Sequence, residues 1–183
     1  GMSRIEHVLD FWFSPENEPF WFAGDKQFDD RVALRLGDLS RLAFAGALDG
    51  WRGSPRGALA LVLLLDQVPR NLHRGTAQAF AGDASALEVA EEAVDRGFDR
   101  GLRQKERLFL YLPFEHSETL GAQERSCSLI AALDEIPDWL QYAVWHKVII
   151  ERFGRFPHRN EALGRLTTTE EMDFLANDPH ASF

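Results

Sequence analysis

The chain has 183 residues, of which 45% are hydrophobic and 11% aromatic, and this composition predicts a folded domain with a sizeable core rather than disorder. The formal net charge of −9 argues against general binding to nucleic acid or to anionic membranes, because both need clustered lysine and arginine. The single cysteine, Cys127, cannot form an intramolecular disulfide, which fits a reducing cytoplasm.

The N-terminal segment shows no signal-peptide pattern. Gly1-Met2 is typical of residues left after removal of an expression tag, so we predict one helical domain over residues 3–183. The longest apolar run, residues 58–65, is far shorter than the ~20 residues that cross a bilayer. We therefore expect a cytoplasmic protein without a membrane partner.

Helical periodicity begins at the start of the chain. Ser3 and Glu6 form a candidate capping box, and the apolar face that follows them stops at Ser14-Pro15. A longer amphipathic helix is expected from about residue 25 to residue 47. Both segments predict helices with one buried face.

The segment from Ala58 to Leu65 is apolar on every side, which predicts a helix at the centre of the fold. A buried strand is the alternative, but the alanine and leucine content favours a helix. We expect this helix to end at Asp66-Gln67, because Pro69 has no N–H group to continue the hydrogen-bond ladder.

The rest of the chain also has helical spacing. Helices are expected at residues 76–80, 83–96, 104–112, 117–133 and 139–153, and after a second candidate capping box at 168–171. The helix at 104–112 should stop before Pro113, and Ser117 should cap the next one. No pair of alternating runs flanks a hairpin turn. The sequence therefore predicts an all-α array of seven to nine helices.

The stretch from residue 152 to residue 160 has the densest polar chemistry. Helix termination explains Arg152, Gly154 and Pro157, because a cation, a left-handed glycine and a proline all suit a helix end. Four further polar residues have no such explanation: Arg155, His158, Arg159 and Asn160. An arginine cluster with histidine and asparagine donors is what binding of a phosphate or carboxylate needs, and a purely structural corner is the alternative.

A similar corner follows the central helix and contains Arg70, Asn71 and Arg74. The order of proline, arginine and asparagine, with an arginine-glycine pair nearby, recurs at residues 157–165. Asp66 needs a partner in its apolar surroundings, and either Arg70 or an arginine of residues 152–160 could supply one. Structural pairing and a ligand-facing role are both open for this corner.

Residues 115–118 place Glu115 and Glu118 beside His116, and His146 lies on the apolar face of a later helix. These side chains are candidates for general acid–base catalysis. The alternative is that Ser117 and Glu118 start a helix and that His146 is a hydrogen-bonded core residue. No zinc-protease signature or cysteine cluster occurs, so we expect no metal and no cofactor.

Three hypotheses for function follow. The first is a polar site for a small anionic metabolite or a peptide carboxylate, which joins the acid–base candidates to these ligand-binding candidates: Arg70, Asn71, Arg74, Arg155, His158, Arg159 and Asn160. The second is a hydrolase that uses glutamate and histidine as acid and base. The third is a scaffold for protein interactions with an exposed groove.

Four blocks of the sequence resemble those of a mainly bacterial family, the domain of unknown function numbered 924. The blocks are Val8–Phe13, Leu64–Asn71, Tyr111–Glu118 and Arg152–Asn160, and Val68 stands where an aromatic residue is expected. The resemblance covers nearly the whole chain. It implies an all-α fold similar to tetratricopeptide-repeat proteins and, by analogy, a concave surface for a ligand or peptide, but it implies no specific function.

Overall fold

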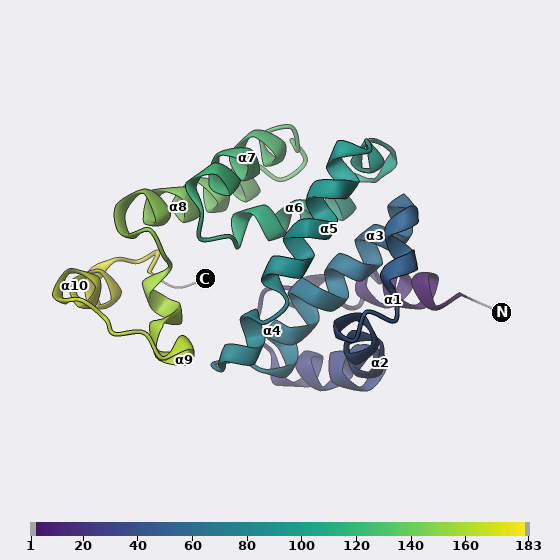
Figure 1. Ribbon diagram of the computed structural model, residues 1–183, viewed down its shortest axis with the longest axis horizontal. Helices are drawn as coiled ribbons and strands as arrows, with labels where there is room; N and C mark the ends of the chain where they lie inside the picture. Colours follow the sequence, from purple (N-terminus) through teal and green to yellow (C-terminus); the bar gives the residue numbers. More distant parts are fainter. Residues whose placement is uncertain (1–2, 182–183) are drawn as a thin grey trace. The chain divides into compact units, whose positions relative to one another are not determined.

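The computed structural model describes residues 3–181, and within this range it contains helices and turns but no strand (Figure 1). The all-α prediction is therefore confirmed. Gly1-Met2, the predicted tag remnant, lies outside the described residues. The chain divides into two compact units, one of residues 1–74 and 78–113 and the other of residues 75–77 and 114–183. A single domain would require the two units to fold as one body. The division into units does not test this, so the single domain stays a prediction.

The first unit contains five complete helices and most of a sixth. Its helices are α1 (Arg4–Trp12), α2 (Lys26–Phe44), α3 (Pro55–Val62), α4 (Val68–Leu72) and α5 (Asp83–Asp95). Helix α6 (Gln104–Glu115) begins in this unit, and its last two residues belong to the second unit. Short 3₁₀ turns occupy Glu18–Phe20, Asp49–Gly53, Ala77–Phe80 and Phe98–Gly101.

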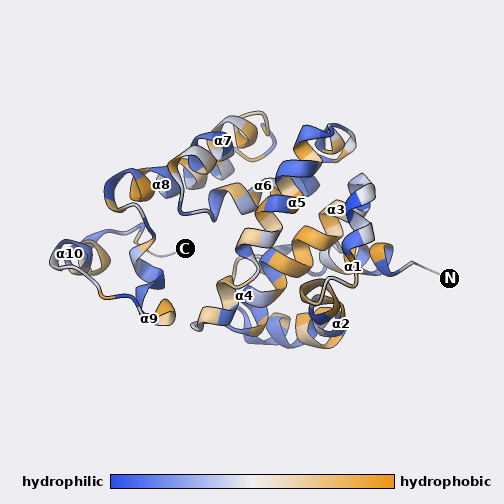
Figure 2. Ribbon diagram, viewed as in Figure 1, coloured by the Kyte–Doolittle hydropathy of each residue, from blue (hydrophilic) through white to orange (hydrophobic). Residues whose placement is uncertain are grey.

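The core of the first unit surrounds α3. Helices α1 and α5 pack against α3, and α2 packs against α4. Every residue from 57 to 69 is buried, and Figure 2 shows α3 as a mostly hydrophobic helix. The prediction of a central helix over residues 58–65 is confirmed, and the alternative of a buried strand is wrong.

The prediction that this helix ends at Asp66-Gln67 is wrong. Residues Leu63–Gln67 form a π-helical turn that joins α3 directly to α4, and the Val68 N–H bonds to the Leu63 carbonyl. A π turn places some carbonyl groups outside the regular ladder, and these need other partners. Ser40 Oγ donates to the Leu64 carbonyl at 2.8 Å, so α2 supplies one of them.

Pro69 lies in the first turn of α4, where its ring removes one donor from the helical ladder. Proline cannot donate to the Leu65 carbonyl. Gly82 lies so close to this carbonyl that a Cβ at position 82 would overlap the Leu65 oxygen. The helix continues past the proline to Leu72.

The prediction that α6 stops before Pro113 is also wrong, because the helix runs on to Glu115. Burial explains the continuation, since residues 108–112 and Phe114 are all buried and a helix end at Leu112 would expose them. Ser117 does not become the N-cap of the next helix. That position is Thr119, and the Ser117 hydroxyl accepts the Thr119 N–H at 3.3 Å.

The second unit contains α7 (Leu120–Ile130), α8 (Asp138–Phe153), α9 (Asn160–Leu163) and α10 (Thr169–Asn177), with a 3₁₀ turn at Pro157–Arg159. Helix α7 packs along α8, as Figure 1 also shows. A small core forms around Ile149, Ile150, Phe156 and Phe174. If α3 and α4 are counted as one helix, the described residues hold nine α-helices, the upper bound of the prediction.

Helix ends mostly follow the predicted signals. Gly154 ends α8 in the left-handed conformation with a φ of 71°, and the capping box of Thr168 and Glu171 starts α10. The capping box of Ser3 and Glu6 is half formed, because Ser3 accepts the Glu6 N–H while the Glu6 carboxylate binds Arg56. Within residues 3–181, no helix has both the length and the apolarity needed to cross a bilayer.

Candidate functional site

Ion pairs hold the first polar corner together within the first unit. The Arg70 guanidinium donates from Nη1 and Nη2 to the two Asp83 carboxylate oxygens, at 2.7 and 3.0 Å. Nη1 also donates to the Asp66 carbonyl at 2.8 Å, and Gln67 Nε2 donates to the Asp66 carboxylate at 2.8 Å. Burial works against the charged guanidinium, but Asp66 and Asp83 outweigh it and raise the pKa of Arg70. The buried Asp66 therefore has the partners that its surroundings require.

The other two candidates of this corner bind a carboxylate on α2. Arg74 donates from Nε and Nη2 to the two Asp29 oxygens at 2.6 and 2.9 Å, and Asn71 Nδ2 donates to Asp29 Oδ1 at 2.8 Å. Burial opposes ionisation of Asp29, yet the hydrogen bonds from Arg74 and Asn71 hold its pKa below the usual range. These contacts support the structural interpretation of the corner, because they fasten the end of α4 to α2.

Arg155, in the second unit, also has a carboxylate partner. Its Nε and Nη2 donate to the two Glu171 oxygens at 2.8 and 2.7 Å, and Nη2 donates to the Leu166 carbonyl at 2.7 Å. This pairing lowers the pKa of Glu171 to about 2. Arg155 therefore anchors the start of α10.

A second clasp in this unit fixes the path of residues 154–160. Arg165 donates to both Glu118 oxygens at 2.8 and 3.1 Å, to the Phe156 carbonyl at 3.1 Å and to Asn160 Oδ1 at 2.9 Å. Glu118 also accepts the Phe156 N–H at 2.6 Å. Although burial raises the pKa of Glu118, the bonds from Arg165 and Phe156 hold it below its usual range. The sequence did not predict Arg165 as a partner, and its only signal was the recurring arginine-glycine pair.

His146 lies on the buried face of α8, and its Nδ1 is 2.7 Å from the Tyr142 carbonyl oxygen. A carbonyl can only accept, so Nδ1 carries the proton and Nε2 is the acceptor of the neutral ring. Glu115 Oε2 lies 3.8 Å from Nδ1, and both side chains are 7% exposed. The contact with Tyr142 agrees with the interpretation of His146 as a hydrogen-bonded core residue.

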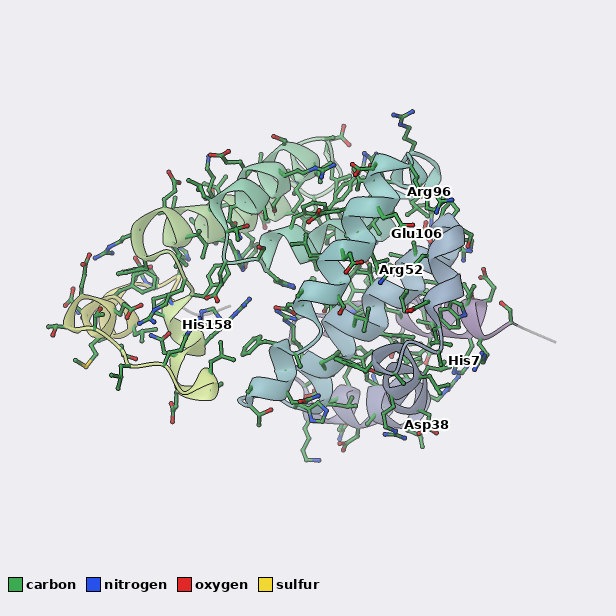
Figure 3. All side chains as sticks on the ribbon, in the orientation of Figure 1. His7, Asp38, Arg52, Arg96, Glu106 and His158 are labelled. Carbon is green, nitrogen blue, oxygen red and sulfur yellow. The ribbon has the colours of Figure 1, made fainter. Side chains whose placement is uncertain are left out.

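Two more histidines and an arginine gather near His146 and the buried ring of Phe156. The His116 ring centre lies 6.4 Å from that of His146, and the Phe156 ring packs edge-on against His146 at 5.4 Å. The His158 ring, labelled in Figure 3, lies 5.9 Å from Phe156. Arg159 Nη2 donates to the His116 carbonyl at 3.0 Å, and its guanidinium lies 4.6 Å from the Phe156 ring centre.

This group is called the histidine cluster, and it comprises Glu115, His116, His146, His158 and Arg159. Burial is the largest cause that lowers the pKa of His146, and the bond to Tyr142 acts in the opposite direction. His116, Arg159 and His158 lower it further by electrostatic repulsion, and the pKa of His146 falls to about 3. Burial and the neighbouring imidazole and guanidinium groups therefore favour the neutral form of the His146 ring.

Gln123, on α7, positions the backbone of the cluster and was not predicted. Its Nε2 donates to the Glu115 carbonyl at 2.6 Å and to the Ser117 carbonyl at 2.7 Å. Because Arg159 holds the carbonyl of His116, each carbonyl from 115 to 117 has a donor. Gln123 is fully buried, and its bonds together with that of Arg159 hold the backbone of residues 115–117 in place.

The structure therefore divides the predicted site residues into two groups. Glu115, His116, His146, His158 and Arg159 gather in the histidine cluster. The others bind carboxylates or neighbouring polar groups: Arg70, Asn71, Arg74, Glu118, Arg155 and Asn160. A single site shared by the first-unit corner and the cluster stays a prediction.

Comparison with known proteins places the chain in a family. It is similar to a solved structure of a protein of unknown function from Agrobacterium tumefaciens, with 43% sequence identity and a TM-score of 0.87 over 93% of this chain and 96% of that chain. No curated protein matches the sequence. A family model described as "Bacterial protein of unknown function (DUF924)" matches residues 8–179, and the chain belongs to that family.

Proposed function

We propose that the histidine cluster binds a small anion that carries a phosphate or carboxylate group. The observation that supports this is the gathering of three imidazoles and one guanidinium around the buried Phe156 ring, beside the carboxylates of Glu115 and Glu118. Burial is the largest cause that keeps a proton off His146, and the electrostatic effects of His116, Arg159 and His158 add to it. A bound anion would attract any positive charge that these neighbouring groups carry.

The other arginines of the polar stretches contribute less to such a site. Arg155 and Arg165 each hold a glutamate through two hydrogen bonds, and Arg70 holds Asp83 in the same way. A ligand would have to displace these carboxylates before it could use the guanidinium groups. Arg159 donates to the His116 carbonyl and lies over the Phe156 ring, and its charge also helps to lower the pKa of Glu118.

The cluster combines buried and accessible groups. His146, Glu115 and Arg159 are buried, whereas His116 and His158 are partly exposed. Charge-assisted hydrogen bonds are strongest away from water, so the buried members would supply affinity. The partly exposed histidines would give a small ligand its approach from solvent.

A thermal-shift screen tests the proposal with phosphate, acetate and citrate as probes. A ligand at 100 times its dissociation constant adds about 2.7 kcal/mol to the free energy of unfolding, which gives a clear rise in melting temperature. We expect at least one of these anions to stabilise the wild-type protein.

The matched variants are His158→Gln and His180→Gln. His180 stacks on Trp145 rather than on a member of the cluster, so its replacement leaves the cluster intact. The stabilisation should be lost in His158→Gln and kept in His180→Gln. Equal stabilisation of the two variants, or none in the wild type, would refute the proposed site.

A second candidate function is hydrolysis, which the approach of Glu115 Oε2 to His146 Nδ1 favours at 3.8 Å. Carboxylate and imidazole in such proximity can act as acid and base, and catalytic contacts are often long before substrate binds. The lowered pKa of His146 makes its ring a weak base. Release of nitrophenol from nitrophenyl phosphate and nitrophenyl acetate tests this candidate. Glu115→Gln should slow turnover at least a hundredfold, and an inactive wild-type protein would reject hydrolysis of these substrate classes.

Three further expectations from the sequence accompany this proposal. A cytoplasmic location, a likeness to tetratricopeptide repeats and a concave binding surface stay predictions. A peptide whose C-terminal carboxylate occupies the cluster is the macromolecular form of the same ligand chemistry. Acetate in the screen represents that carboxylate.

A further inference from the structure

We infer that a pocket between α2 and α4 binds a small aromatic carboxylate, with the ligand's ring against Phe44 and Leu72 and its carboxylate beside Arg41. Every residue that lines this pocket belongs to the first unit, whereas the histidine cluster belongs to the second. The inference therefore goes beyond the proposed anion site and does not depend on it.

The pocket has a volume of about 640 Å³ and lies where α4 packs against α2, two helices that Figure 1 shows side by side. Pockets that bind small molecules commonly measure roughly 300–1,000 Å³. Gly37 contributes to the space, because α2 has no side chain at this position. A Cβ added there would meet a single neighbouring atom within 4 Å, Leu72 Cδ2 at 3.9 Å. The pocket is therefore large enough for an aromatic acid with two fused rings.

The π-helical turn between α3 and α4 borders this pocket. Ser40, which lines the pocket, is the residue whose Oγ donates to the Leu64 carbonyl of the turn at 2.8 Å. Pro69 and Leu72, which follow the turn, form the apolar wall on the side of α4. Single π turns within helices occur frequently at functional sites. Here the turn and its bond to α2 hold the apolar wall in place.

The other apolar surface of the pocket comes from the end of α2. Phe44 lines the pocket, and this large aromatic side chain is 42% exposed. An aromatic ligand that packs on Phe44 would remove apolar surface of both rings from water, and offset or edge-on ring contacts add to that gain. Ala45 lies next to it in the lining and leaves room for the ligand, because its side chain is a single methyl group.

The charged groups of the lining favour an acid over a neutral ligand. Although the chain has a formal net charge of −9, none of the described residues that line this pocket is acidic, and Arg41 and His73 supply its basic groups. Arg41 forms an ion pair with Asp38, but these side chains are 73% and 89% exposed, and such exposed pairs contribute little to stability. A ligand carboxylate can therefore compete for the guanidinium, which can make two parallel bonds to it.

Calorimetric titration of the full chain at pH 7 tests the inference with 2-naphthoate, acetate and 2-naphthalenemethanol. Acetate keeps the carboxylate without the rings, and 2-naphthalenemethanol keeps the rings without the charge. In the wild-type protein, 2-naphthoate should bind at least tenfold more tightly than either of the other two, because it alone uses both the apolar walls and Arg41.

Two variants separate these contributions. Gly37→Leu places a side chain in the pocket and should abolish binding of 2-naphthoate and of 2-naphthalenemethanol. Arg41→Gln removes the charge and should weaken binding of 2-naphthoate at least fivefold while it leaves that of 2-naphthalenemethanol unchanged. The matched control is Arg35→Gln, the same substitution on the same helix. Arg35 lies over the Phe11 ring and not in the lining, so this variant should keep the wild-type affinities.

The outcomes separate this inference from the proposed function. No binding of 2-naphthoate, or equal binding by the wild type and Gly37→Leu, would overturn the inference and leave the anion site standing. Binding that is lost in His158→Gln but kept in Arg41→Gln would assign 2-naphthoate to the histidine cluster and would also overturn it. If circular dichroism shows that Gly37→Leu does not fold, the comparison of Arg41→Gln with Arg35→Gln decides the matter.

Discussion

Arg155 and Arg165 each join two segments of the second unit through a carboxylate. Arg155 connects the end of α8 to Glu171 in the first turn of α10, and Arg165 connects the segment after α9 to Glu118. A planar guanidinium that makes two parallel bonds to a carboxylate fixes orientation as well as distance. These arginines therefore shape the backbone that carries His158 and Arg159.

The Glu171 carboxylate makes stability depend on acid pH. Its pKa is about 2 in the folded protein and 4.5 ordinarily, so the unfolded chain binds the proton first as pH falls. The stabilisation is complete above about pH 4.5 and should be lost progressively between pH 4.5 and pH 2. Urea denaturation across this range should show a steeper loss in the wild type than in Glu171→Gln.

The neighbouring Glu170 is the matched control for that experiment. Its carboxylate is exposed and accepts one bond from Arg152 at 3.2 Å. Glu170→Gln should therefore keep the wild-type dependence on pH. Identical pH dependence of the wild type and Glu171→Gln would show that the Arg155 pair contributes nothing to acid stability.

Single residues were predicted from the sequence where their chemistry lacked a local explanation. His158 and Arg159 were identified this way, because helix termination required neither of them. Gln123 and Arg165 were not identified as partners, since their partners become neighbours only through the fold. Arg165 binds Glu118 across 47 residues, and no spacing rule connects two such positions.

The π-helical turn between α3 and α4 is the main place where a predicted helix boundary differs from the structure. Proline rules predicted a helix end, but the Leu64 and Asp66 carbonyls find side-chain donors in Ser40 and Arg70. Those donors come from α2 and α4. A prediction made from the residues of α3 alone does not take such partners into account. The turn lets a proline follow a buried helix without a break in the chain's direction.

Close approach of Gly82 to this turn gives a prediction for stability. In Gly82→Ala the new Cβ would overlap the Leu65 oxygen and lie 2.9 Å from a Phe44 ring carbon, so the backbone must shift. We expect the free energy of unfolding to fall by roughly 1–3 kcal/mol, as for other overpacked sites. Urea denaturation measures this change.

Gly121→Ala is the control for that variant, because a methyl group added at residue 121 in α7 would meet no neighbouring atom within 4 Å. It should be neutral or slightly stabilising, since alanine favours a helix more than glycine does. Equal effects of the two substitutions would mean that Gly82 does not make the close contact described.

The two recurring corners of the sequence have the same structural role. Asn71 and Arg74 together bind Asp29, and a glycine with a φ of 77° follows them. Asn160 and Arg165 also act together, with Arg165 bound to Glu118 after a glycine with a φ of 67°. In both corners an arginine near a helix end binds a carboxylate, which belongs to α2 in the first corner and to the segment between α6 and α7 in the second.

The all-α class was predictable because helical periodicity extends along nearly the whole chain. The division into two units was not, because the boundary falls inside α6, between Pro113 and Phe114. Composition does not change there, and the apolar face of the helix continues across it. The cluster itself depended on long-range folding, so the sequence predicted its members but not which of the other candidate arginines would bind carboxylates.

One continuous helix with residues in both units predicts that they unfold together. Tryptophan fluorescence can follow the unfolding of each unit. The first unit contains Trp12, Trp21 and Trp51, and the second contains Trp139 and Trp145. Replacement of the tryptophans of one unit by phenylalanine leaves fluorescence from the other. In each resulting protein, the urea transition seen by fluorescence should coincide with the transition seen by circular dichroism, which reports on the helices of both units. A fluorescence transition that differs from the circular-dichroism transition of the same protein would contradict the single-domain prediction.

The most direct test of the anion site uses the six histidines of the chain as internal probes. Phosphate titration followed by NMR of the imidazole signals should shift those of His116, His146 and His158. The signals of His7, His73 and His180 should stay in place, because these residues lie outside the cluster. A saturable shift confined to the first three would support the account, and equal small shifts of all six, or none, would contradict it.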